Sequence, residues 1–196
     1  MKIKRLSAYI IDLLLVSIIS NIIFQLPFFK NDYERYNDSM NQYYEEILNS
    51  GSGDTDVDKL NSMAYDLSQS SLTPNIIRLS ITIVYFCIIQ FLWNGQTIGK
   101  KLMKIRIVSE NGESLNPNLF IIREVVLFNI IFVIIDIIST IYCPKPIYYN
   151  MQQILTLAKI IASFSIIGVM IFREDERGLH DLIGRTTVIE TKSQEK

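Results

Sequence analysis

The chain has 196 residues, of which 49% are hydrophobic, and its formal net charge at pH 7 is −1. This length suits one compact unit, and a net charge so close to zero lacks the basic field by which proteins bind nucleic acid. Its single histidine, His180, excludes a metal centre built from several histidines, so neither a metal site nor a cofactor is expected.

Four long apolar runs, separated by polar segments, dominate the chain. They cover residues 6–29, 76–93, 125–143 and 154–172. A bilayer core about 30 Å thick is crossed by about 20 helical residues at about 1.5 Å per residue, and each run approaches this length. The runs therefore predict an all-α integral membrane protein with four transmembrane helices in a lipid bilayer, organised as a single domain over residues 1–196.

Residues 30–75, between the first and second runs, are strongly acidic. Nine aspartates and glutamates stand against three basic residues. Apolar residues recur at helical spacing on both sides of a Gly-Ser-Gly break at 51–53, which predicts a helical hairpin inserted on the outer membrane face. Two further interpretations stay open for this outer loop: a vestibule that collects cations, and a binding surface for a protein partner.

The loop of residues 94–124 and the tail of residues 173–196 each carry a short β pattern. Residues 104–108 alternate charged and apolar side chains ahead of an Asn-Gly turn, and residues 186–190 read TTVIE. Because an isolated hairpin is marginally stable, the two segments are expected to pair as a small cytoplasmic β element. The loop is not a phosphate-binding loop, since only three residues separate Gly95 from Gly99 and no Ser or Thr follows Lys100.

Lysine and arginine are distributed unevenly over the polar segments. Thirteen of the 19 lie in the N-terminal segment, the 94–124 loop and the C-terminal tail, whereas five lie on the other side of the predicted spans. By the positive-inside bias, both termini and the 94–124 loop are cytoplasmic.

Several motifs, in this order, resemble the RDD family of bacterial multi-span membrane proteins. They are RLSAYIIDLLL at 5–15, GQTIGKKLMKIRIVSENGESL at 95–115, Arg123 ahead of the third run, and ERGLHDLIGRTTVIE at 176–190. The resemblance covers most of the chain except the acidic loop. It implies a multi-pass protein of the bacterial cell membrane, for which cation/proton exchange is the activity proposed.

The family is named for one arginine and two aspartates. The arginine matches Arg5 and the first aspartate matches Asp12. Two positions fit the second aspartate, Asp181 in the tail motif and Asp136 within the third span.

Polar residues recur at similar depths near the predicted cytoplasmic ends of the spans. At about 1.5 Å per residue, Asp12 lies about 9 Å inside the membrane and Asn129 about 7 Å. The residues expected to form one polar cluster in the inner third are Arg5, Asp12, Gln90, Arg123 and Asn129. In the outer third, Asp136 and Lys159 are expected to pair, since a short loop joins their spans.

Charges at such depths cost at least a few kcal/mol, roughly, unless they are paired or hydrated. Two hypotheses explain them. In the first they are a structural lock, with Asp12 paired to an arginine and Asp136 to Lys159. In the second they line a path for protons or monovalent cations, with Asp12 exchanging a proton for the cation.

The tail motif His180-Asp181 has the residue types of an acid/base pair. No candidate nucleophile with supporting spacing stands nearby, so anchoring of the tail to the small sheet is favoured, and no catalytic residue or enzymatic activity is expected. The sequence thus predicts exchange of a small monovalent cation for protons by a homo-oligomer, since four spans are few for an exchanger. The alternative is a non-catalytic membrane partner or assembly factor that acts through the acidic outer loop and the cytoplasmic tail.

Overall fold

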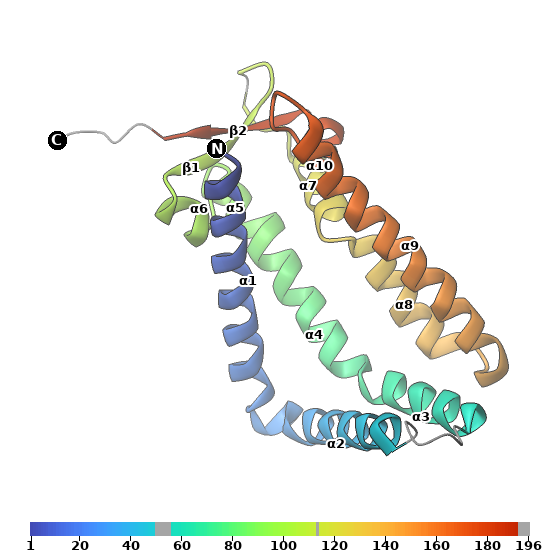
Figure 1. Cartoon of the computed structure of the whole chain (residues 1–196). Helices are drawn as coiled ribbons and strands as arrows, with labels where there is room; N and C mark the ends of the chain where they lie inside the picture. The colour runs from blue at the N-terminus through green and yellow to red at the C-terminus, as the bar shows by residue number, and fades with distance from the viewer. Residues whose placement is uncertain (50–55, 113, 192–196) are drawn as a thin grey trace. The chain divides into compact units, whose positions relative to one another are not determined.

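The computed structural model describes residues 1–49, 56–112 and 114–191 (Figure 1). Within these ranges the chain is mostly helical with one small sheet, as predicted. The elements, in chain order, are α1 (Lys2–Phe24), α2 (Pro27–Asn49), α3 (Val57–Ser70), α4 (Leu72–Thr82), the π-helical segment η2 (Ile83–Ile89), α5 (Gln90–Leu92), α6 (Ile98–Leu102), β1 (Ile105–Ser109), α7 (Pro117–Leu127), α8 (Ile130–Tyr142), α9 (Lys145–Phe172), α10 (Leu179–Ile183) and β2 (Thr186–Glu190).

Three helical segments of the described chain are long and apolar enough to cross a membrane. They are Lys2–Phe24, Leu72–Leu92 and Lys145–Phe172. The helices α7 and α8 meet the same criterion only as a pair, which is bent by 65° where they join. At this break Asn129 has a φ of 52°, a left-handed conformation that asparagine tolerates better than most residues. Counting the bent pair as one span gives a fourth candidate.

The helix boundaries differ from the apolar runs in ways that local chemistry explains. The first run was expected to continue to residue 29, but α1 ends at Phe24 and Pro27 begins α2. Proline is well suited to a first helical position, where its missing N–H leaves no partner unsatisfied. The third run begins earlier than expected because the side chain of Asn116 caps α7, accepting from the backbone N–H groups of residues 118 and 119.

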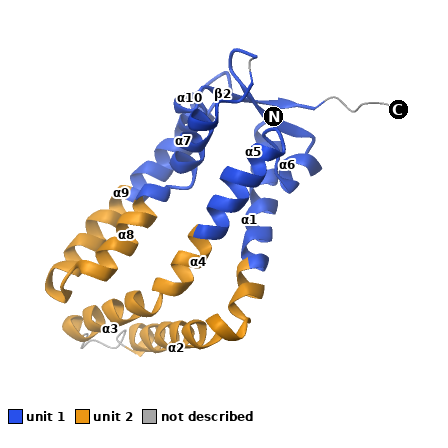
Figure 2. Ribbon diagram, turned by 180° about the vertical axis from the view of Figure 1, so that it is seen from behind, with its two compact units in different colours: residues 1–19, 80–131, 159–196 blue, residues 20–79, 132–158 orange. Residues whose placement is uncertain are grey.

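The chain divides into two compact units, which Figure 2 distinguishes by colour. Unit 1 comprises residues 1–19, 80–131 and 159–196, and unit 2 comprises residues 20–79 and 132–158.

Unit 1 contains the predicted sheet. The strands β1 and β2 pair antiparallel, with Ile105 opposite Glu190 and Ser109 opposite Thr186, which confirms the pairing of the loop with the tail. One face of this sheet is apolar, and its buried residues Ile105, Ile107 and Val188 pack with Ala8 of α1 and Phe120 of α7. The buried apolar residues of β1 thus pack the N-terminal helix against the sheet.

Unit 2 contains the acidic segment as two helices, α2 and α3, on either side of the predicted break. The break itself, residues 51–53, lies outside the described residues. Tyr33 of α2 stacks on Phe24 with the ring centroids 4.5 Å apart, and the Arg78 guanidinium lies 5.4 Å from the centre of the Phe24 ring. The Lys59 ammonium lies 2.7 Å from a Glu46 carboxylate oxygen and joins α3 to α2.

Candidate functional site

A buried carboxylate in unit 1 joins three segments that are far apart in sequence. Asp181, in the first turn of α10, accepts hydrogen bonds from Arg5 Nη2 of α1 and from Arg123 Nε of α7, the latter at 3.1 Å. It also accepts from the backbone N–H of Gly178 at 3.1 Å, which caps its own helix. Arg123 and Asp181 are both fully buried. The N-terminal helix, α7 and the tail are therefore held by one ionic cluster.

The cluster continues through hydrogen bonds to the loop that follows the second candidate span. Arg123 Nη1 forms an ion pair with Glu124, whose Oε1 also accepts from Gln90 Nε2 at 2.8 Å. The amide oxygen of Gln90 in turn accepts from Lys100 Nζ at 2.6 Å. Among the described residues, the other carboxylate oxygen of Glu124, Oε2, is buried without a hydrogen-bond partner. Within the described chain, His180 Nδ1 is also buried without a partner, so the network is incomplete at both atoms.

Burial and neighbouring charge set the protonation of the groups outside the candidate spans. Burial alone would raise the pKa of Asp181, but the Arg123 guanidinium, together with that of Arg5, holds it well below its usual range. Burial, followed by repulsion from Arg123, lowers the pKa of His180 to about 3, so its imidazole is neutral at pH 7. Burial also lowers the pKa of Lys100 to about 8, against the opposing pull of Glu124. Of these three shifted groups, Lys100 has the pKa closest to neutral pH.

Asp12 lies in a separate cage of three hydrogen-bond donors within unit 1. Its Oδ1 accepts from the hydroxyl of Tyr85 at 2.7 Å and from the backbone N–H of Gly99 at 2.8 Å. Its Oδ2 accepts from the hydroxyl of Thr97 at 2.5 Å, and Thr97 is also the N-cap of α6. Asp12 therefore fixes the short helix α6, which carries Lys100, against α1.

The close approach of α6 to α1 depends on the glycine in this cage. A Cβ atom at Gly99 would lie 2.3 Å from the backbone oxygen of Ala8 and 2.9 Å from the Asp12 carboxylate. Because real Cβ contacts are not so short, only glycine allows this geometry without movement of one helix.

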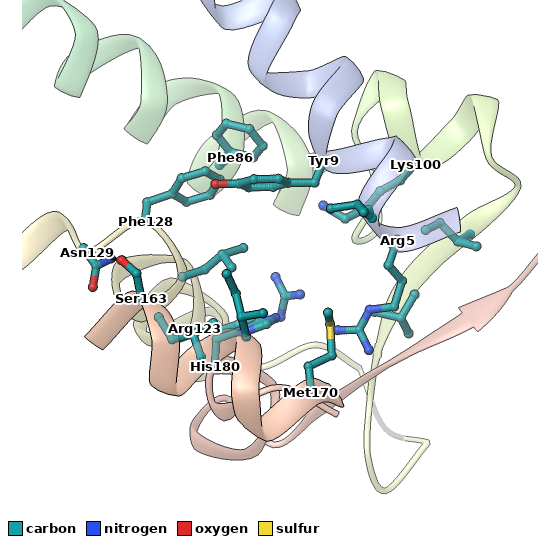
Figure 3. A pocket seen from close by; sticks show the side chains of 16 residues that line it. Arg5, Tyr9, Phe86, Lys100, Arg123, Phe128, Asn129, Ser163, Met170 and His180 are labelled. Atoms are coloured by element: carbon teal, nitrogen blue, oxygen red, sulfur yellow. Dashed lines mark hydrogen bonds between the residues drawn. The ribbon is translucent and has the colours of Figure 1, made fainter. Parts of the chain in front are cut away.

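A cavity of about 300 Å³ lies beside the ionic cluster (Figure 3). Its polar wall carries Arg5, Lys100, Arg123 and His180, and the side-chain nitrogens of Lys100 and Arg123 point into the same space. The remaining lining residues are Leu6, Tyr9, Phe86, Ile105, Leu127, Phe128, Asn129, Ser163, Ile166, Ile167, Met170 and Val188. The cavity is therefore cationic at one end and largely apolar elsewhere.

The residues of the predicted inner cluster lie in three places: the ionic cluster, the Asp12 cage and the cavity. Arg5 and Arg123 meet, but they do so on Asp181 and not on Asp12. Gln90 joins them through Glu124. Asn129 lines the cavity and donates to the Ser163 hydroxyl at 3.0 Å. The predicted tail motif thus lies at the centre of the cluster, with His180 Nε2 3.5 Å from Asp181 Oδ1.

The two residues of the predicted outer pair belong to different units. In unit 2, Asp136 Oδ1 accepts a hydrogen bond from Gln152 Nε2 at 2.7 Å. Lys159 begins the last segment of unit 1. The pairing of Asp136 with Lys159 stays a prediction.

Sequence reasoning missed five members of these networks. They are Tyr85, Thr97, Gly99, Lys100 and Glu124. Three of them lie within the GQTIGKK motif at 95–101. The closely spaced polar residues of this motif, next to the end of a predicted span, were the feature that could have indicated a site. Glu124 follows Arg123 directly, so its charge at the same boundary was also visible.

The sequence was compared with protein-family models, curated proteins and solved structures. The family model described as the RDD family matches residues 3–185, a range that includes every residue of the ionic cluster and of the Asp12 cage. Neither a curated protein nor a solved structure matches the chain.

Proposed function

The chain belongs to the RDD family, and from this premise we propose that it is a multi-pass protein of the bacterial cell membrane with both termini in the cytoplasm. In this proposal α7 and α8 together form one of four spans. Large apolar side chains on the candidate spans, such as Leu14 and Phe164, are exposed and suit contact with acyl chains. The terminal ammonium group lies 3.5 Å from Glu176 of the tail, as expected when both ends share one side.

The proposed activity is exchange of a small monovalent cation for a proton, and the observation that carries it is the Lys100–Gln90–Glu124 arrangement. Lys100 donates to the amide oxygen of Gln90, and Glu124 beside it has a buried oxygen without a donor. Loss of the Lys100 proton would leave this carboxylate less compensated, which is costly for a buried charge. A small cation that binds between Gln90 Oε1 and the Glu124 carboxylate would again compensate this negative charge.

Proton and cation then exclude one another at a single place. When Lys100 is protonated, its ammonium donates a hydrogen bond to the Gln90 amide oxygen and repels any other cation that approaches it. When it is neutral, two oxygen ligands and a negative charge become available. One proton leaves for each monovalent cation that binds, and the lowered pKa of Lys100, about 8, places this competition close to neutral pH.

This assignment differs from the expected exchange at Asp12. The Asp12 carboxylate already accepts hydrogen bonds from three donors, and two of these bonds hold α6 in place. A structural role, with three hydrogen-bond donors in place of the expected arginine, therefore suits Asp12, whereas the exchange hypothesis suits Lys100.

The test is cation-driven dissipation of a pH gradient in proteoliposomes that contain the full chain. Sodium, lithium or potassium should move protons in the wild type, with half-maximal response near the pH at which Lys100 titrates. Lys100→Met removes the proton site and Lys100→Arg holds a permanent charge, so both should abolish the movement. Lys101→Met is the matched control, because the Lys101 ammonium lies over the Trp93 ring, 3.8 Å from its centre, and outside the cluster.

Two results would redirect the proposal. Exchange that survives Lys100→Met but is lost in a folded Asp12→Asn would return the site to Asp12. Absence of exchange in a correctly inserted wild type would favour the non-catalytic partner.

The partner function has its own supporting observation in unit 2. No described residue of α2 is buried, and Tyr44 and Leu48 expose apolar surface on this acidic helix. A surface of this kind suits a protein partner whose contact area is basic with an apolar centre. A photo-crosslinking residue at Leu48 should then give one defined adduct, and the same residue at Gln42, which is also exposed, should not.

A further inference from the structure

The cavity of unit 1 has a cationic wall, of which the proposed cation exchange uses Lys100 alone. Among the described residues its lining includes three side-chain cations, Arg5, Lys100 and Arg123, and no carboxylate. The two acidic partners, Glu124 and Asp181, do not line the cavity; both pair with Arg123, and Asp181 also pairs with Arg5. A ligand in the cavity therefore meets positive charge at one end.

The cations retain hydrogen-bonding capacity toward the cavity. Arg123 uses Nε and Nη1 for its two carboxylate contacts, and within the described chain no hydrogen bond engages its Nη2. Lys100 Nζ has three protons and donates one to Gln90. Figure 3 shows both nitrogen ends directed into the same space. Two donors that converge from different elements match the several oxygens of a phosphate group.

The opposite part of the cavity is apolar and extends to the exterior. The buried Phe86 and Ile166 and the partly buried Phe128 form an apolar wall around this part. Leu6 of α1 and Ile167 of α9 also line the cavity, yet they are 56% and 51% exposed. The opening therefore lies between apolar faces of two candidate membrane spans, where acyl chains and not water would be adjacent.

We propose that this cavity binds one anionic phospholipid, with its phosphate between Lys100 and Arg123 and the upper part of an acyl chain against Phe86, Phe128 and Ile167. The proposal rests on the membrane insertion proposed above and does not require ion exchange. A volume of about 300 Å³ is at the lower end for ligand pockets, so it holds the head group while the rest of the chain follows the exposed helix faces. A zwitterionic head group would place its own cation beside three others and bind less well.

The experiment is native mass spectrometry of the full chain released from nanodiscs that contain equal amounts of phosphatidylglycerol and phosphatidylcholine with matched acyl chains. The wild type should retain one phosphatidylglycerol in preference to phosphatidylcholine. Lys100→Met should reduce this preference about tenfold, the effect of losing one strong charge-assisted contact.

A second pair of variants tests the apolar end. Ile167→Trp places a larger ring at the opening and should reduce phosphatidylglycerol retention about tenfold without changing the polar wall. Ile161→Trp is the matched control, since Ile161 is equally apolar, lies on the same helix, is 65% exposed and does not line the cavity. It should leave retention unchanged.

Three results would overturn the proposal. They are equal retention of the two lipids, retention that is unaffected by Ile167→Trp, and displacement of the lipid by millimolar inorganic phosphate, which would make the cavity a site for a free anion. Extraction of the chain from membranes by alkaline carbonate reports insertion separately. A chain that inserts but retains no lipid contradicts this inference alone, and a chain that fails to insert contradicts the premise.

Discussion

Replacement of His180 should remove most of the pH dependence of stability between pH 7.5 and pH 5. His180 is the only histidine of the chain and is buried in α10, with Nε2 3.5 Å from Asp181 Oδ1. Burial is the main cause that lowers its pKa to about 3, and Arg123, Arg5 and Lys100 add repulsion that outweighs the attraction of Asp181. Folding therefore requires a neutral imidazole.

The sign and size of the effect follow from proton linkage. An unfolded histidine titrates near about 6.5, so below that pH the unfolded chain binds a proton that the folded chain does not. The free energy of unfolding then falls as the pH falls, and this loss ends only near the folded pKa, about 3. Integrated from pH 7.5 to pH 5, one such group costs about 2 kcal/mol, or about 4–8 °C in Tm for a domain of this size.

The chosen window separates His180 from the other shifted groups. Asp181 has a depressed folded pKa, so its contribution is present above its unfolded value, about 3.9, and is lost only below pH 4 or so. The protonation of Lys100 differs appreciably between the folded and unfolded states only near and above its folded pKa, about 8. Neither group titrates appreciably between pH 7.5 and pH 5.

The assay is thermal unfolding of the detergent-solubilised chain, followed by circular dichroism at pH 7.5 and pH 5. The wild type should lose the calculated stability, whereas His180→Gln and His180→Phe should each lose much less between the same two pH values. Two variants are used because the amide preserves polarity and the phenyl ring preserves volume. If both folded variants lose as much stability as the wild type, the assignment to His180 is refuted.

Three further changes test the packing of unit 1 by the same unfolding measurement at pH 7.5. Asp181→Asn should destabilise the chain by about 3–5 kcal/mol, because the buried Arg123 and the partly buried Arg5 lose their shared counter-charge, and a change below about 1 kcal/mol would contradict the central role of this carboxylate. Gly99→Ala should cost about 1–3 kcal/mol through its clash with the backbone of α1, whereas Gly168→Ala, whose Cβ meets no atom within 4 Å, should be neutral or slightly stabilising. Equal midpoints for the two glycine variants would argue against a close approach at α6. Tyr85→Phe should cost about 1 kcal/mol, since Asp12 loses one of three donors, and an unchanged midpoint would show that this bond adds no net stability.

The parts of the fold that sequence analysis predicted are those with strong local signals. The sheet follows from the charged–apolar alternation of residues 104–108 and the strand pattern of residues 186–190, and the two helices α2 and α3 from apolar spacing on both sides of residues 51–53. The end of α1 at Phe24 was hidden because the apolar run continues past it, and only Pro27 indicates the restart. The bend between α7 and α8 has neither proline nor glycine at its centre, where Asn129 alone is left-handed.

The site was less predictable because depth along a helix does not determine which way a side chain faces. Arg5 and Asp12 are two turns apart on α1, which suggested a common cluster. In the structure Arg5 meets the tail and Asp12 meets the loop before β1, so the same helix face serves two partners. Pairing across 176 residues of sequence separation, as for Arg5 and Asp181, depends on tertiary packing that a single sequence does not encode locally.

The hydrogen bonds of Asp12 have a further consequence for the interpretation of exchange experiments. Asp12 fixes α6 through Thr97 and Gly99, and α6 carries Lys100. Substitution of Asp12 would therefore displace Lys100 from Gln90 and abolish exchange even if no ion ever contacted Asp12. Loss of activity in Asp12→Asn alone does not locate the site.

A substitution that leaves the cage intact but changes the acceptor, such as Gln90→Glu, should keep α6 in place and raise the pH of half-maximal exchange, because a second carboxylate beside Lys100 favours its protonated form. An upward shift of that pH, with α6 still in place, is the response that a merely structural role of Lys100 would not produce.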